Sequence, residues 1–317
     1  MIGTNLSQAV KLLKQGQVVA IPTETVYGLA GNALDIKAIS EIFHVKQRPS
    51  FDPLIIHIAN LSDAHKWVKE IPQSLLSLAE QFMPGPLTLL LERKPIIPDL
   101  VTAGSAHVAL RIPAHPLTQR LLQQLNFPLA APSANPFGYI SPTQAAHVQQ
   151  QLGEKIPYIL DGGPCPVGLE STIVGLENGQ VTVFRKGGLA IEAIEQLLGH
   201  KIQVKPFSSS NPEAPGMLKS HYAPHTPFFL GQLNVVLQQF KKEDVGYLSF
   251  KDYSPLLPEA QQIRLSPQGD YKEAAQKLFA AMRLLDNRGL KGIVAELLPE
   301  KDLGLAINDR LRRAAAR

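Results

Sequence analysis

The chain has 317 residues, which is more than one typical core holds and about right for two domains. Hydrophobic residues make up 44% of the chain and charged residues 18%, a balance that excludes an intrinsically disordered protein. The formal net charge of +4 at pH 7 suits an anionic ligand, but it is too small to indicate a nucleic acid partner.

The single cysteine, Cys165, excludes an intrachain disulfide framework and favours a cytoplasmic protein. The sequence does not open with a basic stretch followed by an apolar run, so it predicts no secretory signal. No apolar stretch reaches the ~20 residues that span a bilayer, and we therefore expect no membrane partner.

Residues 1–205 alternate short apolar runs with helical patterns. Three of the apolar runs end directly at a proline, and the lengths of all of them are typical of buried strands; they lie at 18–21, 53–58, 87–91, 108–112, 128–131, 158–160, 172–176 and 181–184. Helical periods fall between them, at 6–14, 36–43, 74–82, 116–125, 143–152 and 191–198. Strands mixed with helices predict an α/β domain on a large, twisted, open sheet.

A second, smaller α/β domain is predicted at 228–317. Residues 206–227 form a linker, because they contain almost nothing that could build a core. Beyond the linker, strand patterns lie at 228–230, 245–250 and 292–297, and helical patterns at 271–286 and 306–316.

The common nucleotide and hydrolase motifs are missing from the sequence. It has no phosphate loop, no dinucleotide glycine motif, no zinc-protease motif and no nucleophile elbow. His221 and His225 have a spacing that a metal could use, but no carboxylate or cysteine lies nearby. We therefore predict no protein metal site, and any nucleotide must be bound by a less common route.

Polar residues at strand ends are the informative feature. Arg111 lies inside an apolar run, where an unpaired guanidinium costs several kcal/mol, so it needs either a structural carboxylate or an anionic ligand. Lys46 and Arg48 could face one polyphosphate, although their spacing alone favours a solvated loop. Ser133 and Asn135 make either a ligand rim or an ordinary turn.

The ordered set of these segments resembles the YrdC domain of the Sua5/YrdC family. The segments are Pro22–Leu29, Lys46-x-Arg48-Pro49, Pro53–Ile55, Pro84–Thr88, Arg111-x-Pro113, Ala131–Asn135 and Glu170–Ile173. Further on, Pro215–Met217 and His221–Pro224 resemble the linker of the two-domain Sua5 form, and Gly304–Leu311 resembles the end of its C-terminal domain. The resemblance implies that residues 206–227 close over the active site of the 1–205 domain.

The activity implied by the resemblance is that of an L-threonylcarbamoyladenylate synthase. Such an enzyme joins L-threonine, bicarbonate or CO2, and ATP with Mg2+ into threonylcarbamoyl-AMP and pyrophosphate. A partner transferase complex then carries the threonylcarbamoyl group to adenosine 37 of tRNA, with room for a weak tRNA contact by the synthase itself. No covalent enzyme nucleophile is needed, so alignment and charge neutralisation would supply most of the rate.

Matching motifs assign roles to individual residues of this sequence. Lys46 and Arg48 would be catalytic, acting on the phosphates. L-threonine would be bound by Thr23, His57, Arg111, Ala131 and Ser171. ATP would be bound by Lys46, Arg48, Ser50, Ser133, Asn135, Ser141, Arg185, His221 and Tyr222.

Asp52 is a departure from the family pattern, because Asn often precedes Pro-Leu there and a carboxylate adds negative charge near the proposed phosphate ligands. One alternative is a YrdC-like module that binds RNA without chemistry, and salt-dependent RNA binding without ATP turnover would favour it. A second alternative is a carbamoyl-adenylate enzyme of hydrogenase maturation, whose zinc fingers a chain with one cysteine cannot form.

Overall fold

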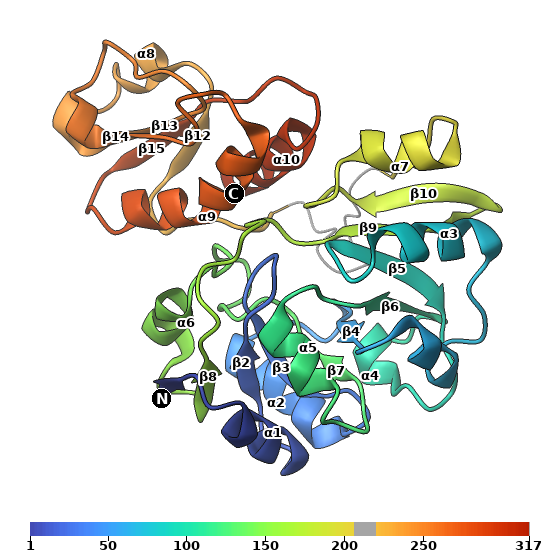
Figure 1. The fold of residues 1–317 in the computed structure, drawn as a ribbon. Coiled ribbons are helices and arrows are strands. Elements are labelled where there is room, and N and C mark those ends of the chain that lie inside the picture. The colour runs from blue at the N-terminus through green and yellow to red at the C-terminus, as the bar shows by residue number, and fades with distance from the viewer. Residues whose placement is uncertain (206–219, 317) are drawn as a thin grey trace.

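The computed structural model describes residues 1–205 and 220–316 (Figure 1). Most of the predicted linker, with its Pro215–Met217 motif, lies outside the described residues. No helix among the described residues is long and apolar enough to cross a bilayer.

The elements follow one another in a mixed order. The helices are α1 (Leu6–Lys14), α2 (Ile36–Lys46), α3 (Gln73–Phe82), α4 (Asp99–Thr102), α5 (Pro116–Leu122), α6 (Ala145–Leu152), α7 (Ile191–Leu198), α8 (Leu233–Val236), α9 (Tyr271–Asp286) and α10 (Gly304–Ala315), with 3-10 turns at Leu61–Lys66, Lys242–Asp244 and Glu259–Gln261. The strands are β1 (Ile2–Gly3), β2 (Val19–Ile21), β3 (Gly28–Asn32), β4 (Ile55–His57), β5 (Leu87–Glu92), β6 (His107–Arg111), β7 (Leu129–Ala130), β8 (Tyr158–Leu160), β9 (Thr172–Glu177), β10 (Gln180–Arg185), β11 (Gln203–Val204), β12 (Phe228–Leu230), β13 (Val245–Ser249), β14 (Gln262–Arg264) and β15 (Gly292–Ala295).

The described strands form two sheets. The larger has the order β1-β8-β2-β3-β7-β4-β6-β5-β9-β10-β11 and mixes parallel with antiparallel pairs, and the smaller has the order β12-β15-β13-β14 with all neighbours parallel. Helices flank both sheets, which confirms the predicted α/β class with a large open sheet and a smaller C-terminal α/β unit (Figure 1).

Most predicted elements are present, and α1, α7 and α9 have the predicted bounds. The sequence reading missed β3, because its glycines lower strand propensity and hide the pattern. Gly31 is needed there for close packing, since a Cβ atom would lie 3.1 Å from Ile42 of α2. Helix α2 then ends where Gln47 adopts a left-handed conformation (φ 53°), which turns the chain and directs Arg48 back toward the sheet.

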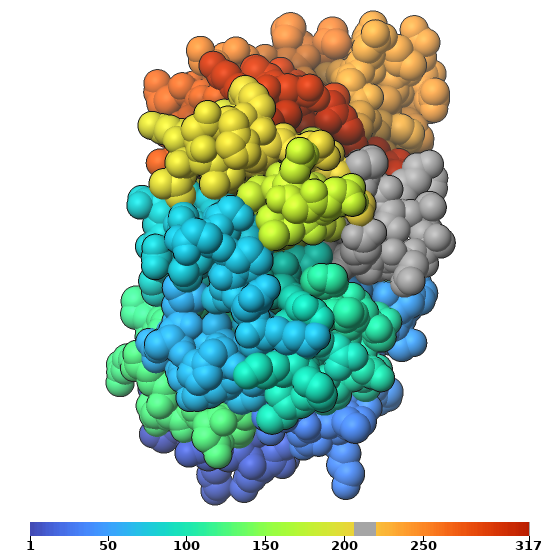
Figure 2. All heavy atoms as spheres, turned by 90° about the vertical axis from the view of Figure 1, so that its right-hand side faces the viewer, coloured from blue at the N-terminus to red at the C-terminus, as the bar shows by residue number. Residues whose placement is uncertain are grey.

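The C-terminal unit shares a core with the large-sheet unit. One cluster of buried apolar side chains combines Val26, Tyr139 and Leu169 with Phe279 and Ile307 of the C-terminal helices. Figure 2 shows the red and orange C-terminal segments lying against the yellow segment that carries α7. This shared core holds α9 and α10 close to the strand ends described next.

Candidate functional site

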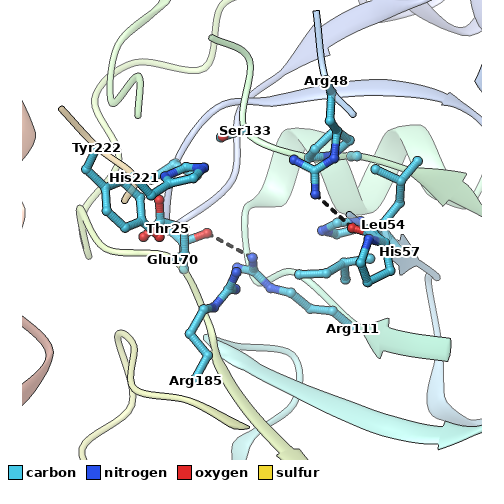
Figure 3. A pocket seen from close by; sticks show the side chains of 15 residues that line it. Thr25, Arg48, Leu54, His57, Arg111, Ser133, Glu170, Arg185, His221 and Tyr222 are labelled. Atoms are coloured by element: carbon cyan, nitrogen blue, oxygen red, sulfur yellow. Dashed lines mark hydrogen bonds between the residues drawn. The ribbon is translucent and has the colours of Figure 1, made fainter. Parts of the chain in front are cut away.

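A cavity of about 50 Å3 lies where several strand ends meet (Figure 3). Its wall combines three guanidinium groups with hydroxyl, imidazole and apolar side chains. The lining residues are Thr25, Val26, Arg48, Pro53, Leu54, Ile55, His57, Arg111, Ala131, Pro132, Ser133, Glu170, Arg185, His221 and Tyr222. Cations gathered around one cavity suit an anionic ligand.

Strand register brings Arg111 to the floor of this cavity. Arg111 ends β6 and pairs in register with His57 of β4 on one side and with Thr88 of β5 on the other. Its guanidinium donates to Glu24 Oε1 at 2.6 Å and to the Thr25 hydroxyl at 2.8 Å. Of the two partners that the sequence allows for Arg111, the structure therefore shows the structural carboxylate. Arg111 also lines the cavity.

The turn after β2 presents Thr25 to the cavity. Thr23 Oγ1 donates to the Val26 carbonyl at 2.6 Å and accepts the amide hydrogens of Thr25 and Val26. Thr23 therefore shapes the turn, whereas Thr25 forms part of the cavity wall.

Arg48 crosses the cavity from the opposite side. Its Nε and Nη2 donate to the carbonyls of Asp52 and Pro53, and Nη2 lies 2.9 Å from the Asp52 carboxylate. Burial lowers the pKa of Arg48, and the nearby Asp52 opposes this shift. Asp52 therefore forms an ion pair with Arg48 and is fully buried.

Lys46 braces the loop that carries Ser133. Its ammonium donates to the backbone carbonyls of Ser133 and Asn135 at 2.5 and 2.6 Å, and burial with the neighbouring Arg48 holds its pKa well below the usual value. The Asn135 side-chain amide donates to the Tyr139 carbonyl at 2.8 Å. Lys46 and Asn135 thus hold the loop in place, and its residues 131–133 line the cavity.

His57 is a neutral imidazole beside a guanidinium. Burial, followed by the positive charge of Arg111, lowers its pKa to about 3. It can therefore accept or donate a hydrogen bond at neutral pH without adding charge to the cavity.

A polar cluster just before β9 and at the end of β10 forms another part of the wall. Arg185 donates to the carbonyl and the hydroxyl of Ser171 at 3.0 and 3.1 Å, and the Ser171 hydroxyl lies 2.6 Å from that of Thr88. Burial lowers the pKa of Arg185 to about 10, which leaves the group charged at neutral pH. Ser141 donates to Glu170 at 2.5 Å, so Ser141 supports Glu170 and Ser171 supports Arg185.

His221 and Tyr222 close the cavity from the C-terminal side (Figure 3). Tyr222 is buried with a left-handed backbone (φ 65°), a strained conformation that persists only where the surroundings hold it. Its ring lies 5.3 Å from the Arg310 guanidinium and 4.7 Å from that of Arg313, both in α10. Burial and Arg313 hold the pKa of His221 well below its usual value, so it is neutral.

Of the predicted site residues, eight line the cavity: Arg48, His57, Arg111, Ala131, Ser133, Arg185, His221 and Tyr222. Five others stand behind the wall as supports, namely Thr23, Lys46, Asn135, Ser141 and Ser171. Ser50 is exposed in the turn after α2.

Sequence reasoning missed Thr25 and Glu170 as wall residues, although both lie inside motifs that it quoted. It also missed the closeness of Arg310, because no local pattern links positions so far apart in the chain.

Two family comparisons cover nearly the whole chain. Residues 11–187 match the family described as Telomere recombination, and residues 189–316 match the family described as Threonylcarbamoyl-AMP synthase, C-terminal domain.

Whole-length relatives agree with these matches. The chain is 39% identical to a threonylcarbamoyl-AMP synthase of Pyrococcus abyssi, over 97% of this chain and 93% of that protein. It is 37% identical to one of Bacillus subtilis, over 98% and 92%. The crystal structure of P. abyssi Sua5 complexed with L-threonine superposes with a TM-score of 0.90 at 39% identity, covering 98% of this chain and 94% of that one. The chain therefore belongs to the two-domain Sua5 family.

Proposed function

We infer that this protein is a threonylcarbamoyl-AMP synthase that supplies the activated intermediate for t6A modification of tRNA. The observation that carries this function is similarity across both domains to relatives of that name, 39% identical over 97% of the chain. The cavity supports it, because three guanidinium groups around one cavity suit a triphosphate together with an amino acid carboxylate.

The threonine site is proposed around Arg111. Its guanidinium would hold the threonine carboxylate alongside Glu24, with Thr25, supported by Thr23, contacting the ligand. His57, Ala131 and Ser171 would form the rest of the pocket. This assignment is supported by the register that pairs Arg111 with His57 and Thr88.

The ATP site is proposed in the rest of the same cavity. Arg48 and Arg185 would neutralise phosphate charge, Ser133 would bind the nucleotide, and His221 with Tyr222 would cover it. Lys46, Asn135 and Ser141 would keep these groups in position, and Lys46 and Ser50 would reach the phosphates directly only after a shift of the loop after α2. A volume of about 50 Å3 holds little more than a few waters, so the cavity would have to widen to admit ATP.

Magnesium would enter with ATP as part of the substrate. Among the described residues, no group of three or more His, Cys, Asp or Glu side chains could hold a metal ion. In nucleotide sites Mg2+ is usually bound mainly by phosphates and water, and we propose the same mode here.

The reaction needs no enzyme nucleophile. The threonine amine adds to CO2 and loses a proton to give a carbamate, whose oxygen attacks the α-phosphorus while pyrophosphate leaves. The residues would align carbamate and phosphate and balance the charge that develops on the leaving group. Neutral His57 and His221 fit this scheme, because they add no positive charge and the guanidinium groups remain the source of it.

The organisation proposed is a catalytic domain of 1–205, a linker of 206–227 that closes over the site, and a C-terminal domain of 228–317. It is supported by the end of the large sheet at β11 and the start of the small sheet at β12. We place the protein in the cytoplasm, where a threonylcarbamoyl-transferase complex would take up the product and where weak direct contact with tRNA could occur.

The deciding experiment measures pyrophosphate release from ATP and Mg2+ with and without L-threonine and bicarbonate, and follows the adenylate by mass spectrometry. The proposed function predicts release that requires both co-substrates, together with a mass of threonylcarbamoyl-AMP. Absence of turnover combined with salt-dependent RNA binding would replace it with the non-catalytic RNA-binding alternative.

A further inference from the structure

Glu170 is an acidic side chain in the wall of a cavity that otherwise suits an anion. It lines the cavity and is 7% exposed. Burial raises its pKa, but the positive charges of Arg310 and Arg185 outweigh burial, so the carboxyl is ionised at neutral pH. An ionised carboxylate near a polyphosphate repels it unless a fixed positive charge compensates.

Arg310 of α10 supplies that charge from the C-terminal domain. Its Nε and Nη2 both donate to Glu170 Oε2 at 3.1 Å. Its Nη1 donates to the Lys186 carbonyl at 2.6 Å and to the Asp309 carboxylate at 2.9 Å. Arg310 is fully buried and Ser141 holds the other oxygen of Glu170, so both members of the pair are fixed in one geometry.

The ion pair between Arg310 and Glu170 is informative because of its position at the cavity, and less because of its contribution to the stability of the protein. A buried ion pair is weak evidence for stabilisation, because desolvation of both charges offsets their attraction. Arg185 lines the same cavity and is electrostatically coupled to Glu170. If Arg310 were lost, Glu170 would draw on the positive charge of Arg185, which is the charge assigned to the ATP phosphates.

We propose that Arg310 is a positioning residue of the active site: by holding and neutralising Glu170, the C-terminal domain sets the charge of the cavity that binds ATP. Arg310 stands behind Glu170 and acts on the ligand only through it. This inference rests on the proposed function, since it takes the ATP phosphates as the anion. It also gives a role to the Asn308-Asp309-Arg310 motif, which the proposed reaction leaves unused.

The test compares four full-length proteins by calorimetric titration with Mg–ATP: the wild type, Arg310→Met, the double variant Arg310→Met with Glu170→Gln, and Arg312→Met. Arg312 is the matched control, because it lies on the same helix but is 43% exposed in an ion pair with Glu300. Thermal unfolding of each protein shows that folded samples are compared.

Arg310→Met should weaken ATP binding on the order of tenfold, because a carboxylate in the cavity wall loses the charge that neutralises it. The added Glu170→Gln should restore the affinity to within about threefold of the wild type, because it removes the charge that Arg310 neutralised. Arg312→Met should bind as the wild type does. Equal affinity in Arg310→Met and wild type, or a double variant as weak as Arg310→Met, would overturn the proposal.

Glu170→Gln alone keeps the proposal testable if Arg310→Met does not fold. With Arg310 still present, removing the carboxylate makes the cavity more positive, so ATP should bind more tightly. Weaker binding would mean that Glu170 contacts the ligand directly, which overturns the charge-neutralising role. A wild type that binds no ATP would instead contradict the proposed function, so the two failures are distinguishable.

Discussion

At the scale of single residues, the site consists of buried charges whose partners are already present in the protein. Arg111 contacts Glu24, Arg48 contacts Asp52, and Arg310 contacts Glu170. Each cation is therefore fixed before any ligand arrives, which reduces the entropy lost on binding. The same carboxylates reduce the positive charge that the ligand meets. Each ion pair therefore holds its arginine in position but weakens the attraction of that arginine for an anion.

Arg111→Ala should abolish the stimulation of pyrophosphate release by threonine, because the proposed carboxylate ligand is removed. It should also lower the free energy of unfolding by about 3–5 kcal/mol, since Glu24 is left buried and unpaired. Threonine titration and urea unfolding measure the two effects, with the exposed Arg120→Ala as control. Threonine affinity equal to the wild type would contradict the role of Arg111.

Asp52→Asn should strengthen ATP binding by roughly threefold to tenfold, because Arg48 keeps its position but loses the neighbouring negative charge. Calorimetry with Mg–ATP measures the change. Asp63→Asn removes a carboxylate that pairs with Lys66 on the surface, and it should have no effect. Weaker binding by Asp52→Asn would show that the carboxylate is needed to hold Arg48 in place.

His57 should make stability depend on pH below neutrality. Its folded pKa of about 3 lies below the unfolded value near 6.5, so the unfolded state binds the proton first. Stability should then fall as the pH drops from 6.5 toward 3, at up to about 1.4 kcal/mol per pH unit for this group. Urea unfolding at pH 7 and 5 should show a smaller loss for His57→Gln, by about 2 kcal/mol. Identical losses in both proteins would argue against a buried neutral imidazole.

At the scale of elements, short connections at strand ends carry the chemistry and the strands set their spacing. The parallel pairing of β4 with β6 aligns His57 with Arg111, and β5 brings Thr88 to the other side. The turn after β2 and the loop after β7 then supply hydroxyl groups from two sides. Helix α2 joins these pieces, because its last residue, Lys46, binds the loop after β7.

Lys46→Met should lower the free energy of unfolding by about 2–4 kcal/mol, because one buried and one half-buried carbonyl lose their donor. ATP affinity should fall as well, since the loop that carries Ser133 is no longer held. Lys37→Met, an exposed change on the same helix, is the matched control for urea unfolding and ATP titration. Lost ATP affinity with unchanged stability would instead favour a direct contact of Lys46 with the phosphates.

At the scale of the whole molecule, one acidic residue joins the two domains near the end of the linker. Asp286, the last residue of α9, accepts hydrogen bonds from the Tyr139 hydroxyl and from the amides of His225 and Thr226. Tyr139 belongs to the large-sheet domain and stacks on His225 at 4.6 Å. The segment that carries His221 and Tyr222 is therefore anchored close to both domains.

Asp286→Ala should lower the free energy of unfolding by about 2–3 kcal/mol, because three donors lose a charged acceptor. It should also raise the KM for ATP, since His221 and Tyr222 lose their anchor. Urea unfolding and steady-state kinetics measure these changes, and Asp252→Ala removes an exposed carboxylate of the same domain as control. If Asp286→Ala is destabilised but keeps the wild-type kinetics, Asp286 stabilises the fold without affecting the active site.

Local sequence patterns predict the α/β class, most strands and helices, and the segments that supply the cavity wall. Local apolar patterns and turn residues act over a few positions, so α1, α7 and α9 were predicted with their bounds. An arginine inside an apolar run is also recognisable from the local sequence, because its burial requires a partner. The glycine-rich β3 escaped detection, since packing against its neighbours rather than its composition makes it a strand.

Which charged side chains meet depends on the folding of the whole chain. The partner of Arg111 is Glu24, far away in the chain, and the carboxylate of Glu170 is paired by Arg310 from the other domain. The fold also distinguishes residues that line the cavity from residues that support them. Thr25 lines the cavity, whereas Thr23 lies in the turn behind it. The physical reason is that strand register and domain packing are set by the whole core, whereas a sequence pattern reports only its immediate surroundings.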